Sequence, residues 1–227
     1  MEEIVKNGQV FIPFRQPKIE TEEMIPLTEN HFLWSDQRRS IRDFSDDRVP
    51  REVIENIIKT ASTAPSGAHK QPWTFCAVSN ASLKNKIRVA AEEEEKENYA
   101  SRMSETWKQD LQAFDTNWQK PFLEIAPWLI IVFKKIYDVD KNNQKIQHYY
   151  VSESVGLACG FLLQAIHQAG LIALTHTPSP MNFLIKILQR PPYEKPFLLI
   201  PVGYPADNAI VPKLERKGLN EIAVFYD

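Results

Sequence analysis

The chain has 227 residues, with 27 Lys or Arg and 29 Asp or Glu, so its formal net charge is -2. Hydrophobic residues make up 43% and charged residues 25%, an ordinary mixture for a globular protein. This length fits one large α/β domain. The near-neutral charge argues against a general nucleic-acid-binding protein, which usually needs a basic face. Only 7 glycines exclude collagen-like and glycine-rich linker architectures.

The cysteines and histidines predict no metal site. Cys76 and Cys159 are far apart in apolar stretches, which is typical of two reduced thiols in a cytoplasmic protein. The five histidines lack zinc-binding spacing. No charge occurs between Glu153 and Lys186, but glycine, proline and polar residues interrupt that stretch, so we expect no membrane span and no membrane partner. The start of the chain shows no signal peptide.

The first third of the chain predicts an arm, two helices and a strand. Residues 1–26 contain three prolines and are expected to form an extended arm. Thr28 is a candidate cap for a helix to about Arg38. Pro50 opens an amphipathic helix whose apolar residues follow the 3.6-residue period. After a loop over 63–69, the β-rich run 73–78 predicts a strand.

Two further helices and a buried strand follow. Asn80 or Ser82 caps a long charged helix to about Met103, and a polar-aromatic stretch over 105–118 is also expected to be helical. The apolar run 128–133 predicts a buried strand.

An apolar helix is then expected over 149–168, with Gly156 and Gly160 on one face allowing close contact with another helix. Gly170 ends it. Core strands are predicted over 171–174 and 197–202, before a tail over 205–227. Strands alternating with long helices indicate an α+β or α/β domain in layers. The sequence lacks the glycine-rich signatures of Rossmann and P-loop proteins, so side chains rather than glycine amides must provide most of the contacts to any bound phosphate.

Four groups of residues could carry chemistry, and each has a plain structural alternative. Arg38, Arg39, Ser40 and Arg42 could bind a phosphate through guanidinium forks and a hydroxyl, or form a solvated basic helix end. The loop of Pro65, Ser66, Gly67 and Ala68 could present a hydrogen-bond donor, or only terminate a helix.

The third group lies in the acidic run 92–99, where Glu95 and Tyr99 share one helix face and could receive an ammonium group. The alternative is a solvated helix face. In the fourth group, Thr175, His176 and Thr177 follow an apolar strand, where ligands often lie in α/β folds. A satisfied turn is the alternative there.

Together these residues resemble the flavin nitroreductase superfamily and, within it, the iodotyrosine deiodinase branch. The likeness runs from about Gln37 to about Ile222. Arg38 to Arg42 resemble the superfamily in general. The loop from Ala64 to His69, taken with Glu95, Tyr99 and Lys120, is specific to the branch.

The resemblance implies an α+β (α/β three-layer) fold, with a central, mostly antiparallel sheet flanked by helices, in an intertwined homodimer that binds FMN. Residues 1–26 would form the arm and 27–227 the nitroreductase-like domain. That domain would include a substrate lid at about 90–120 and a C-terminal tail contacting the partner subunit.

The resemblance also implies roles for individual residues. Contacts to FMN are expected from Arg38, Arg39, Ser40, Arg42 and Arg216 around the phosphate and ribityl chain, from Pro65, Ser66 and Gly67 along the ring, and from Thr175, His176 and Thr177 at its other edge. The Thr177 hydroxyl would lie near flavin N5 and act in catalysis by favouring one-electron steps. Members from animals often carry a smaller residue where this chain has His176.

The implied substrate is a halotyrosine, which carries both an ammonium and a carboxylate. Glu95 would bind its ammonium and Lys120 its carboxylate, with Tyr99 at the same end and the Ala68 N–H on the phenolate. The implied reaction is reductive dehalogenation of 3-iodotyrosine and related halotyrosines to tyrosine and halide, with electrons from NAD(P)H or a separate reductase. The alternatives are a general FMN-dependent nitroreductase or quinone reductase, and a non-enzymatic flavin- or aromatic-amino-acid-binding module.

Overall fold

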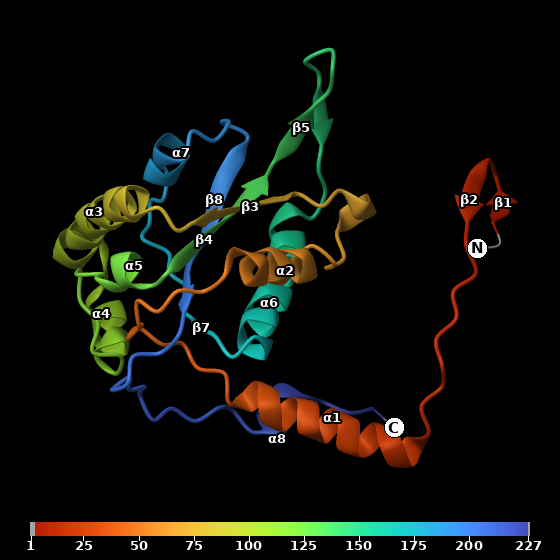
Figure 1. Cartoon of the computed structure of the whole chain (residues 1–227), viewed down its shortest axis with the longest axis horizontal. Coiled ribbons are helices and arrows are strands. Elements are labelled where there is room, and N and C mark those ends of the chain that lie inside the picture. The colour runs from red at the N-terminus through yellow and green to blue at the C-terminus, as the bar shows by residue number, and fades with distance from the viewer. Residues whose placement is uncertain (1–2, 227) are drawn as a thin grey trace. The chain divides into compact units, whose positions relative to one another are not determined.

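The computed structural model describes residues 3–226 (Figure 1). The chain divides after Arg38 into two compact units. The described part of the predicted extended arm lies in the first of them, but the expectation of an extended chain is wrong from Thr21 onward, where a helix begins. None of the described helices is long and apolar enough to cross a bilayer.

The first unit contains a hairpin and a helix. Strands β1 (Ile4–Lys6) and β2 (Gln9–Phe11) pair antiparallel, and Asn7 and Gly8 turn the chain with positive φ angles of 53° and 75°. Helix α1 spans Thr21–Asp36, so the predicted start at Thr28 is wrong. The Thr28 hydroxyl bonds back to the carbonyls of the preceding helical turn, which satisfies it inside the helix.

The second unit is built on a four-stranded sheet. Its strands are β3 (Trp73–Val78), β4 (Trp128–Lys135), β8 (Glu194–Gly203) and β7 (Ile172–Ala173), in that order across the sheet. All three pairings are antiparallel, which confirms the predicted sheet.

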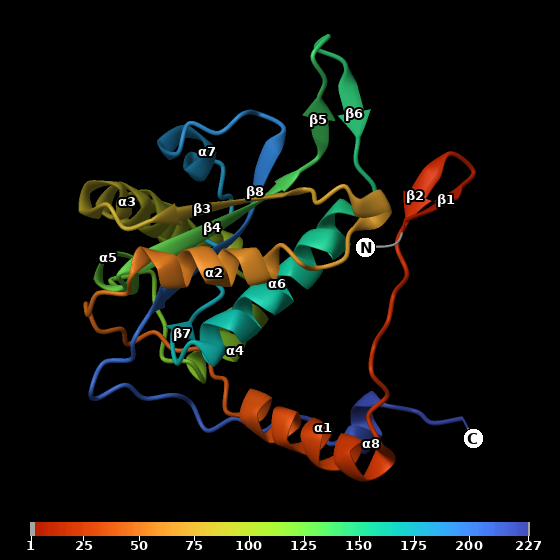
Figure 2. The same ribbon diagram turned by 45° about the vertical axis from the view of Figure 1, so that its right-hand side comes forward.

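Helices cover both faces of this sheet (Figures 1 and 2). They are α2 (Arg51–Ala61) and α6 (Val151–Gln168) on one face, and α3 (Ala81–Glu97) and α5 (Phe122–Ile125) on the other. Strand β4 shows why. Ile130 and Val132 belong to the core under α2 and α6, whereas Ile131 and Phe133 belong to the core under α3 and α5. Because successive side chains of a strand point to opposite faces, a strand buried on both sides is apolar throughout.

The sequence predicted the cap of α3 but not the end of the next helix. The Asn80 Oδ1 accepts a hydrogen bond from the Leu83 N–H at 2.9 Å. Helix α4 covers Glu105–Gln112 and stops short of the predicted end at 118. Asp115 has a φ of 44°, which a continuing helix cannot accommodate.

Helix α6 begins at Val151, after Tyr150 in a left-handed conformation. The close helix contact expected at Gly156 and Gly160 does not occur within the described chain, because a Cβ built at either glycine meets nothing within 4 Å. Gly170 ends the helix with a φ of 72°, as predicted.

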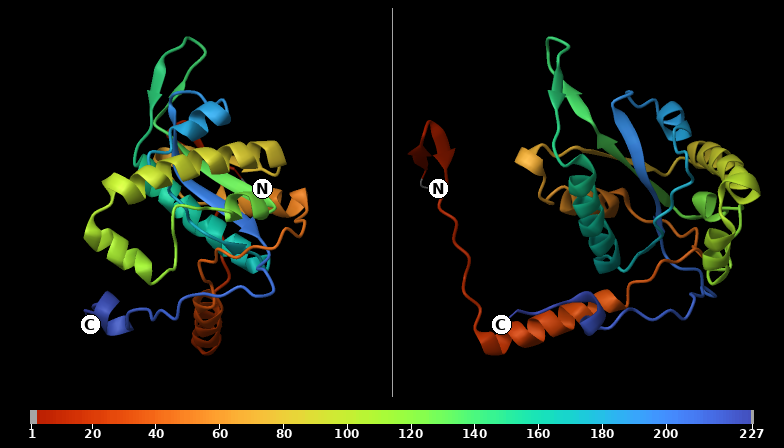
Figure 3. Two further views of the ribbon diagram at one scale, coloured as in Figure 1. Left: turned by 90° about the vertical axis from the view of Figure 1, so that its left-hand side faces the viewer. Right: turned by 180° about the vertical axis from the view of Figure 1, so that it is seen from behind.

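The remaining elements are short. They are η1 (Gly67–His69), η2 (Asn98–Arg102), β5 (Tyr137–Val139), β6 (Lys145–Gln147), α7 (Phe183–Ile187) and α8 (Leu219–Ile222). The hairpin of β5 and β6 projects beyond the four-stranded sheet (Figure 3). Apart from α8, the predicted tail has no helix or strand among its described residues.

Candidate functional site

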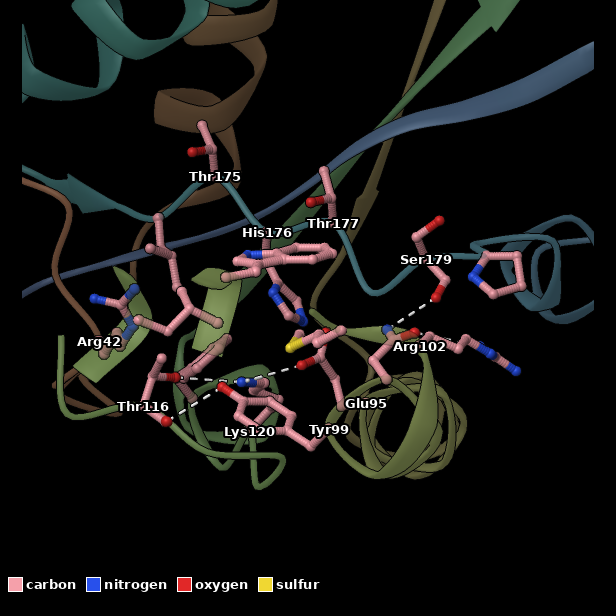
Figure 4. A pocket seen from close by; sticks show the side chains of 17 residues that line it. Arg42, Glu95, Tyr99, Arg102, Thr116, Lys120, Thr175, His176, Thr177 and Ser179 are labelled. Carbon is pink, nitrogen blue, oxygen red and sulfur yellow. Dashed lines mark hydrogen bonds and ion pairs between the residues drawn. The ribbon is translucent and has the colours of Figure 1, made fainter. Parts of the chain in front are cut away.

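A pocket of about 360 Å³ brings together many of the predicted site residues (Figure 4). It lies where α3 and η2 meet the segment after β7 and the segment between α4 and α5. The predicted residues in its wall are Arg42, Glu95, Tyr99, Lys120, Thr175, His176 and Thr177.

The pocket contains a buried ion pair. The Oε2 atom of Glu95 lies 3.4 Å from the Nζ atom of Lys120, and the two side chains are only 8% and 5% exposed. Burial raises the pKa of Glu95 and lowers the pKa of Lys120, whereas the opposite charge of each partner works against its shift. A buried pair of this kind is poorly compensated unless further polar groups join it.

Lys120 and Tyr99 are held by the chain between α4 and α5. The Lys120 ammonium donates to the Thr116 hydroxyl at 3.3 Å and also to the Asn117 carbonyl. The Tyr99 hydroxyl donates to the Thr116 carbonyl at 3.1 Å. The backbone N–H of Lys120 donates to Glu92 at 2.6 Å, which fastens this segment to α3. The pair at 95 and 120 therefore depends on how two separate segments pack.

His176 sits on a short extension of the sheet. It exchanges two backbone hydrogen bonds with Leu199 of β8, at 2.9 and 3.0 Å. Alternate side chains of this extended segment point to opposite sides, so Thr175 and Thr177 lie on one side and the His176 imidazole on the other (Figure 4). Both threonines are exposed, whereas His176 is buried.

Burial, together with the positive charges of Lys120 and Arg42, lowers the pKa of His176 to about 3. The imidazole is therefore neutral near pH 7. Arg42 itself is half-buried, with its guanidinium carbon 5.5 Å from the centre of the Phe114 ring.

Other predicted residues lie outside this pocket. The Arg39 guanidinium donates to the Pro212 carbonyl. The backbone of Ser40 forms an isolated parallel β-bridge with that of Ala173. Arg216 belongs to the segment after β8. Arg38 is the last residue of the first unit.

The loop of Pro65, Ser66, Gly67 and Ala68 also lies away from the pocket, at the end of α2 beside the start of α6 (Figure 1). The Gly67 N–H donates to the Ser154 hydroxyl at 3.3 Å. A Cβ on Gly67 would lie 2.8 Å from the Tyr149 carbonyl oxygen, so the close approach requires glycine. Ala68 has a φ of 48°, a conformation rare for a residue with a side chain.

The structure adds residues that the sequence reasoning did not select. They are Asn98, Arg102, Met103, Trp107, Leu111, Thr116, Phe122, Leu174, Ser179 and Pro180. Met103, Trp107 and Leu111 are spaced four residues apart within a polar stretch, and that apolar stripe could have identified them. The other contacts have no such signal, because residues distant in sequence meet there. For example, the Asn98 amide donates to the Ser179 carbonyl at 2.9 Å.

Comparisons with known proteins agree on one family. The model of the nitroreductase family matches residues 36–204. An iodotyrosine deiodinase of Haliscomenobacter hydrossis is 60% identical over 222 residues, which are 98% of this chain and 100% of that protein. Iodotyrosine deiodinase 1 of Homo sapiens is 45% identical over 214 residues, 94% of this chain and 74% of that protein.

Solved structures share the fold. A crystal structure of oxidized iodotyrosine deiodinase bound to FMN and 3-iodo-L-tyrosine matches with a TM-score of 0.72 and 32% identity, over 86% of this chain and 98% of that chain. A nitroreductase with bound FMN from Bacteroides fragilis matches with a TM-score of 0.63 over 86% of this chain and 98% of that chain. At 17% identity, this second match bears on the fold alone.

Proposed function

Because this chain belongs to the nitroreductase family and, within it, to the iodotyrosine deiodinases, we propose that it is an FMN-dependent enzyme that removes iodide from 3-iodotyrosine. The products are tyrosine and iodide, and related halotyrosines react in the same way. The observation that carries this proposal is the buried pair of Glu95 and Lys120 in the wall of the pocket. A general nitroreductase or quinone reductase has no need of two opposite buried charges.

The pair matches the polar end of an amino acid. Glu95 binds the substrate ammonium and Lys120 binds the substrate carboxylate, so each buried charge gains a new partner of opposite sign. Charge-assisted hydrogen bonds of this kind contribute about 1.5–3 kcal/mol each. Tyr99 lies beside the pair, with its ring centre 5.6 Å from the Lys120 ammonium. We propose it as the third group at this end.

The residues present fit a flavin. Thr175 and Thr177 expose their hydroxyls on one side of the pocket edge, and neither has a hydrogen-bond partner within the described chain. Arg42 contributes a half-buried guanidinium to the same pocket. FMN, when bound, supplies the electrons that cleave the carbon–iodine bond.

The phosphate of FMN is negatively charged, and several cationic side chains are needed to bind it. We propose that Arg38, Arg39, Ser40, Arg42 and Arg216 hold it together with the ribityl chain. The contact between Arg39 and the Pro212 carbonyl supports this set, because it brings the segment before Arg216 beside the start of the second unit.

Thr177 is the proposed catalytic residue. With FMN bound, the Thr177 hydroxyl would donate to flavin N5 and would thereby favour one-electron chemistry. Thr175 and His176 complete this edge of the flavin site, His176 through its backbone.

A second copy of the chain completes the site. Pro65, Ser66 and Gly67 are proposed to lie along the flavin ring, and the Ala68 N–H to bind the substrate phenolate. These residues lie away from the pocket of their own chain, which supports an assembly in which each loop serves the partner's site. The outward face of α6 carries Gly156 and Gly160 beside Leu157 and Phe161, which are 50% and 41% exposed. Such an apolar face fits a homodimer interface.

The segment at about 90–120 is proposed as a lid over the substrate, and the C-terminal tail as a contact with the partner subunit. Electrons come from NAD(P)H, either directly or through a separate reductase. The proposed location is the cytoplasm, where the free thiols of Cys76 and Cys159 remain reduced.

Anaerobic reduction of the purified protein, followed by 3-iodotyrosine, tests the function. The expected result is reoxidation of the flavin with release of iodide and tyrosine in equal amounts. Reduced protein that reoxidises with nitroaromatics or quinones but releases no iodide would establish the alternative reductase. Reduced flavin that reacts with none of these compounds would establish a binding module.

A further inference from the structure

The side chain of His176 has an unmet hydrogen-bonding group. Its Nε2 atom is buried and has no hydrogen-bond partner, the single such side-chain atom among the described residues. The residue as a whole is only 9% exposed and lies in the wall of the pocket. A buried polar atom without a partner costs free energy, so a polar partner supplied by a ligand would restore that loss.

The surroundings hold the imidazole in place. Two backbone hydrogen bonds to Leu199 fix the main chain of His176. The ring meets Phe122 edge-to-face, with ring centres 5.5 Å apart and an interplanar angle of 87°. The imidazole therefore has few ways to turn its Nε2 toward another protein group.

The chemistry around the ring favours an anionic partner. Lys120 and Arg42 are the charged groups close enough to shift the titration of His176, and both are cations. The imidazole stays neutral beside them, so one ring nitrogen carries a proton and the other is an acceptor, and an anionic partner selects the tautomer with the proton on Nε2. Thr175 and Thr177 are the proposed flavin contacts. The His176 ring points to the opposite side of this segment from the two threonines (Figure 4).

We propose, on the basis of the proposed function, that His176 is a further substrate-binding residue, whose Nε2–H donates a hydrogen bond to the substrate carboxylate that Lys120 binds. The imidazole gives this end of the site a directed donor, whereas the Lys120 ammonium supplies charge. His176 thus helps distinguish an α-amino acid from an amine that has the same ring and no carboxylate.

Binding to the oxidised, FMN-loaded protein tests this role without turnover. Two ligands are compared by isothermal titration calorimetry: 3-iodotyrosine and 3-iodotyramine, which lacks the carboxylate. His176→Phe removes the donor and keeps a ring, and His176→Gln places an amide nitrogen near the position of Nε2. His176→Asn is the matched control, because its shorter amide reaches only the position of Nδ1.

We expect His176→Phe and His176→Asn to bind 3-iodotyrosine about tenfold more weakly than the parent chain, and His176→Gln to retain most of the affinity. The affinity for 3-iodotyramine should not change in any variant. An equal loss for both ligands would overturn the proposal and assign His176 to packing. Unchanged binding of 3-iodotyrosine in His176→Phe, or loss of FMN from that variant, would also overturn it.

A measurement on the unmodified protein covers the case in which a variant does not fold. With ¹⁵N-labelled histidine, the Nε2 resonance of His176 should move on addition of 3-iodotyrosine and stay in place on addition of 3-iodotyramine. A resonance that ignores both ligands, or responds equally to both, would overturn the proposal. Failure of the unmodified FMN-loaded protein to bind 3-iodotyrosine at all would refute the proposed function as well, so the two failures are distinguishable.

Discussion

The carboxylate of Glu95 and the ammonium of Lys120 face each other at 3.4 Å in the wall of the pocket, with both side chains almost fully buried. Each is the other's main counter-charge, and desolvation works against the charged form of both. A ligand that carries both an ammonium and a carboxylate can take the place of each partner. Glu95 and Lys120 can then move apart while each still has an opposite charge beside it. This arrangement fits the zwitterion of the proposed substrate.

Removing one of these charges should damage substrate binding more than flavin binding. In Glu95→Gln the substrate ammonium loses its partner, and we expect kcat/KM for 3-iodotyrosine to fall about 10- to 100-fold, the equivalent of about 1.5–3 kcal/mol. FMN content should stay close to that of the parent chain. Glu93→Gln, at an exposed position of the same helix, is the control and should leave turnover unchanged. Equal rates for Glu95→Gln and the parent chain would mean that the buried pair serves stability alone.

Loss of the Thr177 hydroxyl should change the chemistry that the flavin performs. If this hydroxyl donates to flavin N5, Thr177→Ala should release iodide about fivefold more slowly or worse, since one hydrogen bond contributes about 1 kcal/mol. Two-electron reduction of a nitroaromatic should be retained. Thr177→Ser keeps a hydroxyl and should restore iodide release. Similar iodide rates in the alanine and serine variants would remove Thr177 from the mechanism.

His176 should make the folded state sensitive to acid. Its pKa is about 3 in the folded protein and near 6.5 when exposed, so between these values the unfolded chain binds a proton that the folded chain does not. The free energy of unfolding should therefore fall as the pH drops below about 6.5, by up to about 1.4 kcal/mol per pH unit, and His176 should have no such effect above that pH.

Urea unfolding of the FMN-loaded protein at about pH 7.5 and about pH 5 measures this effect. His176→Gln cannot titrate, so its stability should decline less over the same interval. An identical decline in the two proteins would show that the imidazole is accessible to protons in the folded state.

The outward face of α6 should control assembly. Gly160→Leu introduces no clash within the described chain, because a Cβ there meets nothing within 4 Å. If α6 packs against a second copy, the added side chain should weaken the dimer, and sedimentation should show monomer at a protein concentration where the parent chain is dimeric. Glu52→Leu, at an exposed position of α2, controls for the added apolar surface. A Gly160→Leu dimer of unchanged affinity would place the interface elsewhere.

The local elements of this protein follow from its sequence, because their signals lie within short windows. The strand Trp73–Val78 is predicted at its observed bounds. The apolar run that starts at Trp128 predicts a buried strand, and both faces of β4 are indeed covered by core residues. Pro50 and the Asn80 side chain mark the starts of two helices. Family resemblance added the roles of residues that no local pattern could assign.

Only the tertiary structure decided which of these residues meet. Lys120 reaches Glu95 because the chain before α5 packs back against α3, and no periodicity in the sequence encodes that contact. The structure also shows that the loop around Gly67 lies away from the pocket. This loop follows α2 and contacts the start of α6. The sequence suggested His176 only as a flavin contact, and it became a candidate for binding the substrate only because its Nε2 is buried without a partner. Secondary structure follows from propensities and spacing along the chain, whereas a binding site depends on burial and on contacts between distant segments, which exist only after the chain has packed.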